Sequence, residues 1–188
     1  MRHLSRVSAF VLIAALAACS SQKAPAEAAV KAARDAYNTV DASDARYAAT
    51  EAKAVRDSVE NAEAALSRAA YPLAIQEATG VPDRVVKLQA AIAARKAELT
   101  EKWAKASAAI PPFMAQVTKK LAGGGGLAKP AADKAHASLE AASNAWTEAT
   151  VAGQSGDIGT AASKADDVKS ALVMLANQMK MKVPADLQ

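Results

Sequence analysis

Residues 83–109 of the chain read DRVVKLQAAIAARKAELTEKWAKASAA, and this stretch decides the fold class. Its large apolar residues recur every three to seven positions, a spacing that places them on one face of an α-helix. The stretch holds no glycine and no proline, which are the residues that end helices. We expect one long helix here, with core candidates Val85, Leu88, Ile92, Leu99 and Trp103.

The composition outside this stretch favours the same fold class. Alanine, the residue with the best helix propensity, supplies 52 of the 188 residues, whereas aromatic residues make up only 4%. Alanine buries little area, so the cores are expected to be thin and the helices to lie close together. The sequence therefore predicts an all-α protein, an elongated helical bundle of about five to seven helices.

Prolines and glycines divide the predicted helices. We expect a helical region over 26–122 with a break or kink at 41–44, and the stretch Ile110-Pro111-Pro112 is predicted to end the long helix. Gly123 to Gly126 lie in a predicted Gly-rich hinge, 123–129. The region 130–188 is predicted to be a C-terminal helical hairpin with Asp157 capping its second helix and a frayed tail after Pro184.

The chain also matches part of itself at an offset of 87 residues. Alanine, valine and leucine recur at this distance, in the pairs Ala62/Ala149, Ala65/Ala152, Ala74/Ala161, Ala78/Ala165, Val81/Val168 and Leu88/Leu175. In so alanine-rich a chain such matches also arise by coincidence. A duplicated helix hairpin and a chance match therefore both remain open, and either predicts paired antiparallel helices.

The N-terminal residues are predicted to form an export signal. Arg2 and Arg6 precede an apolar run over 7–15, which is shorter than the roughly 20 residues that a membrane-spanning helix needs. The run leads into Leu16-Ala17-Ala18-Cys19, which contains the single cysteine of the chain. We expect 1–18 to be cleaved and 19–25 to form a short tether. A plain secretory signal followed by a stray cysteine is the alternative.

This segment resembles the signal peptide and lipobox of bacterial lipoproteins. The resemblance implies that Cys19 carries a diacylglycerol and an amine-linked acyl chain such as palmitate. Several acyl chains anchor a protein stably without spanning the membrane. Since Ser20, not aspartate, follows the cysteine, the resemblance implies the cell outer membrane, facing the periplasm, rather than the inner membrane.

A second resemblance concerns the helical part. The sequence Ala45-Arg46-Tyr47-Ala48, followed by Tyr71, Ala74 and Ala78, resembles alanine-rich bacterial lipoproteins classed as domains of unknown function. The match covers roughly 26–100 and rests on common residues. It implies a helical fold and no activity.

Charge and side-chain chemistry argue against several functions. Without residues 1–18 the chain has 21 Lys and Arg against 19 Asp and Glu, so nucleic acid is not an expected partner. His136 stands alone, without cysteine or a second histidine, so neither a metal site nor a Ser-His-Asp site is expected. We expect no catalytic residue and no cofactor.

Trp103 and Trp146 are the two largest side chains in this aromatic-poor sequence. They are interpreted either as core anchors or as contacts for a protein partner, since tryptophan is common in binding hot spots. The expected function is a structural or protein-interaction role in the cell envelope, with an unidentified envelope protein as partner. The alternative is a lipoprotein that binds or carries a lipid or a small apolar ligand in a groove between helices.

Overall fold

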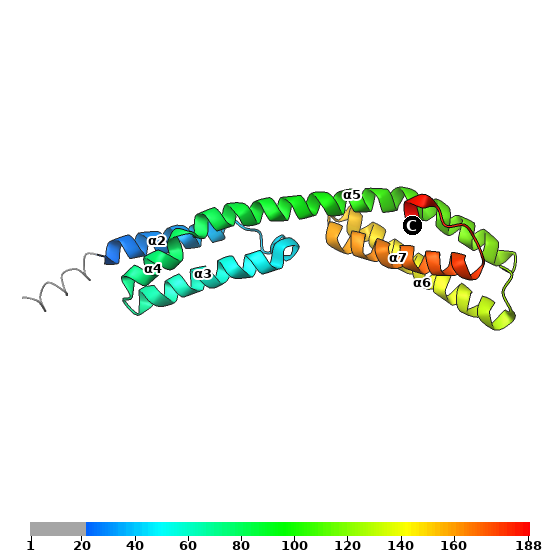
Figure 1. The fold of residues 1–188 in the computed structure, drawn as a ribbon, viewed down its shortest axis with the longest axis horizontal. Helices are drawn as coiled ribbons and strands as arrows, with labels where there is room; N and C mark the ends of the chain where they lie inside the picture. The colour runs from blue at the N-terminus through cyan, green and yellow to red at the C-terminus, as the bar shows by residue number, and fades with distance from the viewer. Residues whose placement is uncertain (1–21) are drawn as a thin grey trace, which may run out of the picture. The chain divides into compact units, whose positions relative to one another are not determined.

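The computed structural model describes residues 22–188, and these fold as α-helices without β-strands (Figure 1). The helices, whose number falls within the expected range, are α2 Lys23–Tyr37, α3 Ala49–Ser67, α4 Tyr71–Thr79, α5 Val81–Ala122, α6 Lys129–Gln154 and α7 Ile158–Gln178. Two short 3-10 helices, η1 Ala45–Ala48 and η2 Ala185–Leu187, complete the fold. The all-α prediction is confirmed.

The chain divides into two compact units within α5. Unit 1 ends at Ala93 and unit 2 runs from Ala94 to Gln188. Unit 1 packs α2, α3 and α4 together with the first three turns of α5. Unit 2 packs the rest of α5 against the antiparallel pair α6 and α7 (Figure 1). Each unit is thus a three-helix bundle, since α4 and the start of α5 act together as the third helix of unit 1.

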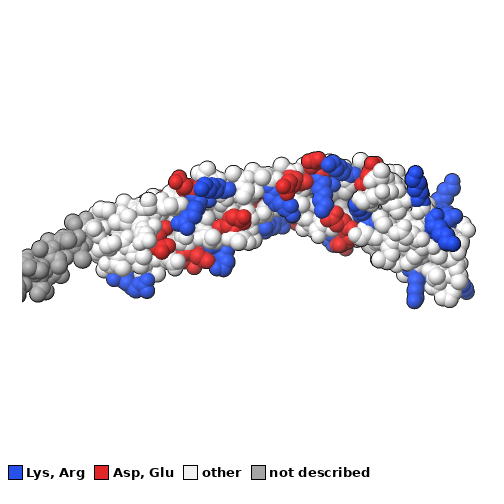
Figure 2. All heavy atoms as spheres, viewed as in Figure 1, with Lys and Arg blue, Asp and Glu red and all other residues white. Residues whose placement is uncertain are grey.

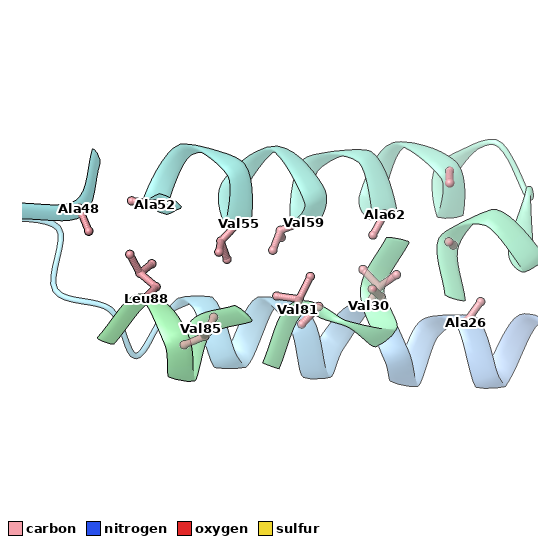
Figure 3. Packing of buried hydrophobic residues seen from close by; sticks show 14 of the residues in the cluster. Ala26, Val30, Ala48, Ala52, Val55, Val59, Ala62, Val81, Val85 and Leu88 are labelled. Atoms are coloured by element: carbon pink, nitrogen blue, oxygen red, sulfur yellow. The ribbon is translucent and has the colours of Figure 1, made fainter. Parts of the chain in front are cut away.

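Alanine and valine build the core of unit 1. Val55 and Val59 of α3 face Val81 and Val85 of α5, and Val30 of α2 lies beside them (Figure 3). All five are at most 5% exposed. Small side chains let the helix axes approach closely, so contact between backbones replaces part of the area that larger side chains would bury.

Four helices end in the same type of turn. After α3, α6 and α7 one residue adopts a positive φ, and after α5 Gly124, Gly125 and Gly126 all do. In each turn the N–H that follows the first positive-φ residue donates to a carbonyl five residues back. This Schellman arrangement satisfies carbonyl groups left free at a helix end. Glycine occupies the positive-φ position at Gly124 and Gly156, whereas Ala69 and Lys180 hold the other two at φ 57° and 54°.

The two units repeat each other at the offset of 87 residues. Ala69 and Gly156 correspond, as do the hydrogen bonds Ala70 N–H to Ala65 O and Asp157 N–H to Ala152 O, both 2.9 Å long. Core positions correspond as well, in buried pairs that include Ala26/Phe113, Val30/Val117, Val55/Ala142, Ala62/Ala149, Ala74/Ala161, Val81/Val168, Val85/Leu172, Leu88/Leu175 and Ile92/Met179. The structure therefore favours duplication over coincidence, and the repeated unit has three helices rather than the two of a hairpin.

Replacing Ala69 with glycine, the residue at the matching position of unit 2, is expected to stabilise unit 1 by about 0.5–1 kcal/mol. A Cβ in the left-handed region costs about 1–2 kcal/mol, and the greater freedom of glycine in the unfolded chain cancels part of the gain. Thermal unfolding followed by circular dichroism measures the change. Ala64→Gly on the exposed face of α3 is the control, and it should lose about 1 kcal/mol. Equal losses in both variants would contradict the prediction.

The prediction that α5 ends at Ile110-Pro111-Pro112 is wrong, because the helix continues through both prolines to Ala122. Both prolines are exposed, whereas Ile110 and Phe113 on either side are buried in the core of unit 2. Ile110 and Phe113 continue the apolar stripe of α5 together with Val117 and Leu121. Each buried side chain contributes about 1.5–3 kcal/mol, so the four together supply about 6–12 kcal/mol against the roughly 6 kcal/mol that two prolines cost inside a helix.

The glycine run does not separate the two units. It closes the turn between the C-terminal part of α5 and α6, both of which belong to unit 2, whereas the division falls at Ala93. The prediction of a frayed tail is also wrong. Leu187 of η2 is buried in the core of unit 2, and Lys169 Nζ donates to Gln188 O at 3.1 Å.

The remaining boundaries differ from the predictions by a few residues or agree with them. Helix α2 begins at Lys23, so Pro25 lies in its first turn. Backbone N–H groups in the first turn have no acceptor within the helix, so the missing N–H of proline costs no hydrogen bond there. The chain breaks between Tyr37 and Ala45, as expected around 41–44. Asp157 caps α7, since its Oδ1 accepts from Thr160 N–H at 3.1 Å, and this prediction is confirmed.

Candidate functional site

Cys19, the predicted lipid attachment site, lies outside the residues that the structure describes. The first described helix begins four residues after it, at Lys23. The predicted tether, 19–25, is therefore helical from Lys23 onward, and the four residue steps from Cys19 to Lys23 span at most about 14 Å. Any lipid on Cys19 would therefore hold the start of α2 close to the membrane surface.

Trp103 of α5 and Trp146 of α6 lie against each other in unit 2. Their ring centroids are 5.4 Å apart and their planes are inclined by 30°. Both side chains are half-buried and pack on the core of unit 2. The structure brings together two residues that are 43 positions apart in the sequence, and it gives both a packing role.

Gly153 makes room for this pair. A Cβ placed on Gly153 would lie 2.8 Å from Cε2 and 2.9 Å from Cζ2 of Trp103, closer than real Cβ contacts come. The indole therefore lies directly against the backbone of α6, near the end of that helix. Nothing local in the sequence indicates that a tryptophan 50 residues earlier covers Gly153.

Unit 1 contains a small hollow between α3 and α5. Its volume is about 220 Å³, and its lining residues are Glu51, Ala54, Val55, Arg84, Lys87 and Leu88. Beside it, Arg84 Nη1 donates to Oγ of the buried Ser58 at 2.8 Å, and this hydroxyl donates to Ala54 O at 3.1 Å. Pockets for small ligands usually measure about 300–1,000 Å³. The hollow is smaller than such a pocket.

Several titratable side chains within 22–188 form ion pairs on the surface. No group of three or more histidine, cysteine or carboxylate side chains in this range could hold a metal ion. His136 is exposed on α6, and Asp166 accepts from Lys102 at 2.5 Å. The hydrogen bond from Arg34 to Glu63 raises the pKa of that arginine, and the hydrogen bond from Lys105 lowers the pKa of Glu101. Both are exposed pairs of the kind that contribute little to stability.

Comparisons with known proteins give no relative for this chain: no family model, no curated protein and no solved structure matches it. Among residues 22–188, no helix combines the length and apolar character needed to cross a membrane.

Proposed function

We propose that this protein is an outer-membrane lipoprotein that faces the periplasm and has a structural or protein-interaction role in the cell envelope. The observation that carries the proposal is the sequence Leu16-Ala17-Ala18-Cys19 after a short apolar run, with the single cysteine of the chain at its end. Cys19 is the lipid attachment site. Ser20 directs the protein to the outer membrane.

The architecture of the described residues supports a structural role. A three-helix unit occurs twice in series, and the 42-residue α5 belongs to both copies. Each copy has exposed helical faces that other proteins can contact, and this role does not depend on an enclosed site. Charged pairs such as Arg34 with Glu63 and Lys102 with Asp166 cover the exposed faces. The role of ligand carrier has less support, because the hollow in unit 1 is small and the larger hollows of unit 2, of about 430 and 510 Å³, are open to solvent.

Cys19→Ser is expected to abolish acylation. Cells that produce the full chain are labelled with a radioactive fatty acid, and the label on the purified protein is measured. The wild-type chain should carry the label and Cys19→Ser should carry none, because serine has no thiol for the thioether bond. The control is the double variant Ser5→Cys, Cys19→Ser, which restores one thiol within the predicted signal but not at position 19, and it should also carry no label. Equal labelling of wild type and Cys19→Ser would place the anchor elsewhere.

Membrane choice is tested separately with Ser20→Asp. We expect this variant to remain acylated but to move from the outer-membrane to the inner-membrane fraction of a density gradient. A wild-type protein in the inner-membrane fraction would contradict the outer-membrane assignment but not the lipid anchor at Cys19.

The interaction role is tested by photo-crosslinking from the exposed side chains of Val86, Val151 and Met174. Crosslinks to the chain itself alone would contradict a protein partner.

A further inference from the structure

One end of unit 2 carries only lysine as its cationic residue. The C-terminal turn of α5, the first two turns of α6 and the segment after α7 meet at this end, because α6 runs antiparallel to the other two helices. We call the six exposed lysines there the basic end: Lys119, Lys120, Lys129, Lys134, Lys180 and Lys182. In Figure 2 this end of the unit shows Lys and Arg side chains without adjacent Asp or Glu.

The lysines of the basic end differ from other cations of unit 2 in having no ion-pair partner among the described residues. Elsewhere in the unit Lys102 pairs with Asp166, Lys105 with Glu101 and Lys164 with Glu148. Asp133 is the one carboxylate within 113–138, and 176–184 contains none. The positive charge of unit 2, with twelve Lys and Arg against nine Asp and Glu, is therefore concentrated at this end.

Helix stability does not account for this cluster. Lysines in the last turn of α5 and after α7 lie at helix C-termini, where the helix dipole favours positive charge. Lys129 and Lys134 lie in the first two turns of α6, where the same dipole disfavours it. Six unpaired cations also repel one another. Mutual repulsion and the dipole of α6 therefore oppose the cluster, which points to a partner that carries negative charge.

The chemistry of the end favours a lipid surface over a polymer or a protein. Segments 114–135 and 176–188 contain no arginine, the residue suited to bidentate recognition of individual phosphates. They contain no Phe, Tyr or Trp either, and so offer nothing for bases to stack on. Clusters of four to eight cationic residues are typical of proteins that bind anionic phospholipids. An open hollow of about 430 Å³ lined by Gln116, Lys119, Lys120 and Gly123 offers room for a headgroup.

We propose that the basic end of unit 2 docks on the surface of a bilayer that contains anionic phospholipids. The lysines act as point charges on three chain segments and contact the headgroup layer without inserting apolar residues. The proposal does not depend on the lipid at Cys19. If that lipid is present, the chain holds a membrane at its N-terminus and has a second membrane contact in unit 2.

Vesicle clustering tests the proposal on the full chain. The purified protein is loaded onto donor vesicles of phosphatidylcholine. Acceptor vesicles of phosphatidylcholine, with or without about 30 mol% phosphatidylglycerol, are then added, and the donors that sediment with dense acceptors are counted. We expect capture by anionic acceptors only. Capture should fall when the salt concentration is raised to about 1 M, where the Debye length is about 3 Å.

The decisive variant removes one lysine from each segment: Lys119→Gln, Lys129→Gln and Lys182→Gln together. Each lysine near an anionic surface is worth about fivefold in binding, so the triple variant should bind about 100-fold more weakly. The matched control is Lys102→Gln, Lys105→Gln and Lys164→Gln, which removes the same charge from paired lysines of the same unit. It should bind nearly as well as wild type.

The outcomes distinguish failure of the membrane contact at the basic end from failure of the lipid anchor at Cys19. A protein that does not remain on neutral donor vesicles contradicts the lipid anchor alone, and the soluble protein is then sedimented with the acceptors directly. Absence of binding to anionic acceptors, or equal weakening in both triple variants, overturns the basic end as a membrane contact. Tighter binding to heparin or DNA than to anionic vesicles at the same salt concentration would assign the surface to an anionic polymer instead.

Discussion

Replacing Phe113 with alanine is expected to lower the free energy of unfolding of unit 2 by about 3–5 kcal/mol. Phe113 is 1% exposed and is among the largest fully buried side chains of the described residues. It lies directly after Pro111 and Pro112, where it joins the second half of α5 to the core. Its loss leaves a cavity and also removes part of the burial that keeps α5 continuous through the prolines.

Tryptophan fluorescence in urea measures the effect on unit 2, because Trp103 and Trp146 both belong to this unit. The control is Val151→Ala on α6, where a side chain that is 60% exposed is shortened, and its midpoint should shift by less than the equivalent of about 0.5 kcal/mol. A loss below about 1 kcal/mol for Phe113→Ala would show that the site collapses around the smaller side chain.

The second large effect is expected at Gly153, where alanine should destabilise unit 2 by about 1–2 kcal/mol. The new methyl group would meet the Trp103 ring at 2.8–2.9 Å, and the cost of overpacking is typically about 1–3 kcal/mol. The better helix propensity of alanine offsets up to about 1 kcal/mol. If the indole instead swings outward, it loses its contact with Trp146, which is worth about 0.5–1.5 kcal/mol beyond the buried area.

Fluorescence reports both consequences of Gly153→Ala. The urea midpoint should fall, and the emission maximum should move to longer wavelength as Trp103 becomes more exposed to water. Gly123→Ala is the matched control, because a Cβ there would meet Lys120 O at an ordinary 3.5 Å. An unchanged emission spectrum and midpoint in Gly153→Ala would contradict the close packing of Trp103 on α6.

Local patterns predicted most of the secondary structure. Alanine content and apolar spacing identified the helices, and Asp157 was identified as a cap from its position before α7. These features depend on neighbours within a few positions along the chain. The offset of 87 residues was visible too, but alanine is so common that the sequence alone did not separate duplication from coincidence.

Long-range packing decided the features that sequence reasoning missed. Proline ends most helices, yet α5 continues through Pro111 and Pro112 because the residues on both sides of them pack in the same core. The tail after Pro184 was predicted to be frayed, but Leu187 is buried in the same core. The basic end escaped notice because the net charge of the chain is small and the six lysines come from three separate stretches. A count of lysines on either side of each predicted turn would have indicated it.

The sequence by itself determined that the chain is helical and where most helices begin, and it carries the prediction of an export signal ending in Cys19. These properties follow from propensity, apolar spacing and short motifs, which act over a few residues. Only the tertiary structure decided that α5 continues through its prolines and that the boundary between two three-helix units lies within this helix. It also decided that the Trp103 ring packs on Gly153 and that six lysines lie at one end of unit 2. Each of these depends on contacts between residues far apart in the sequence, whose burial free energy outweighs local preference.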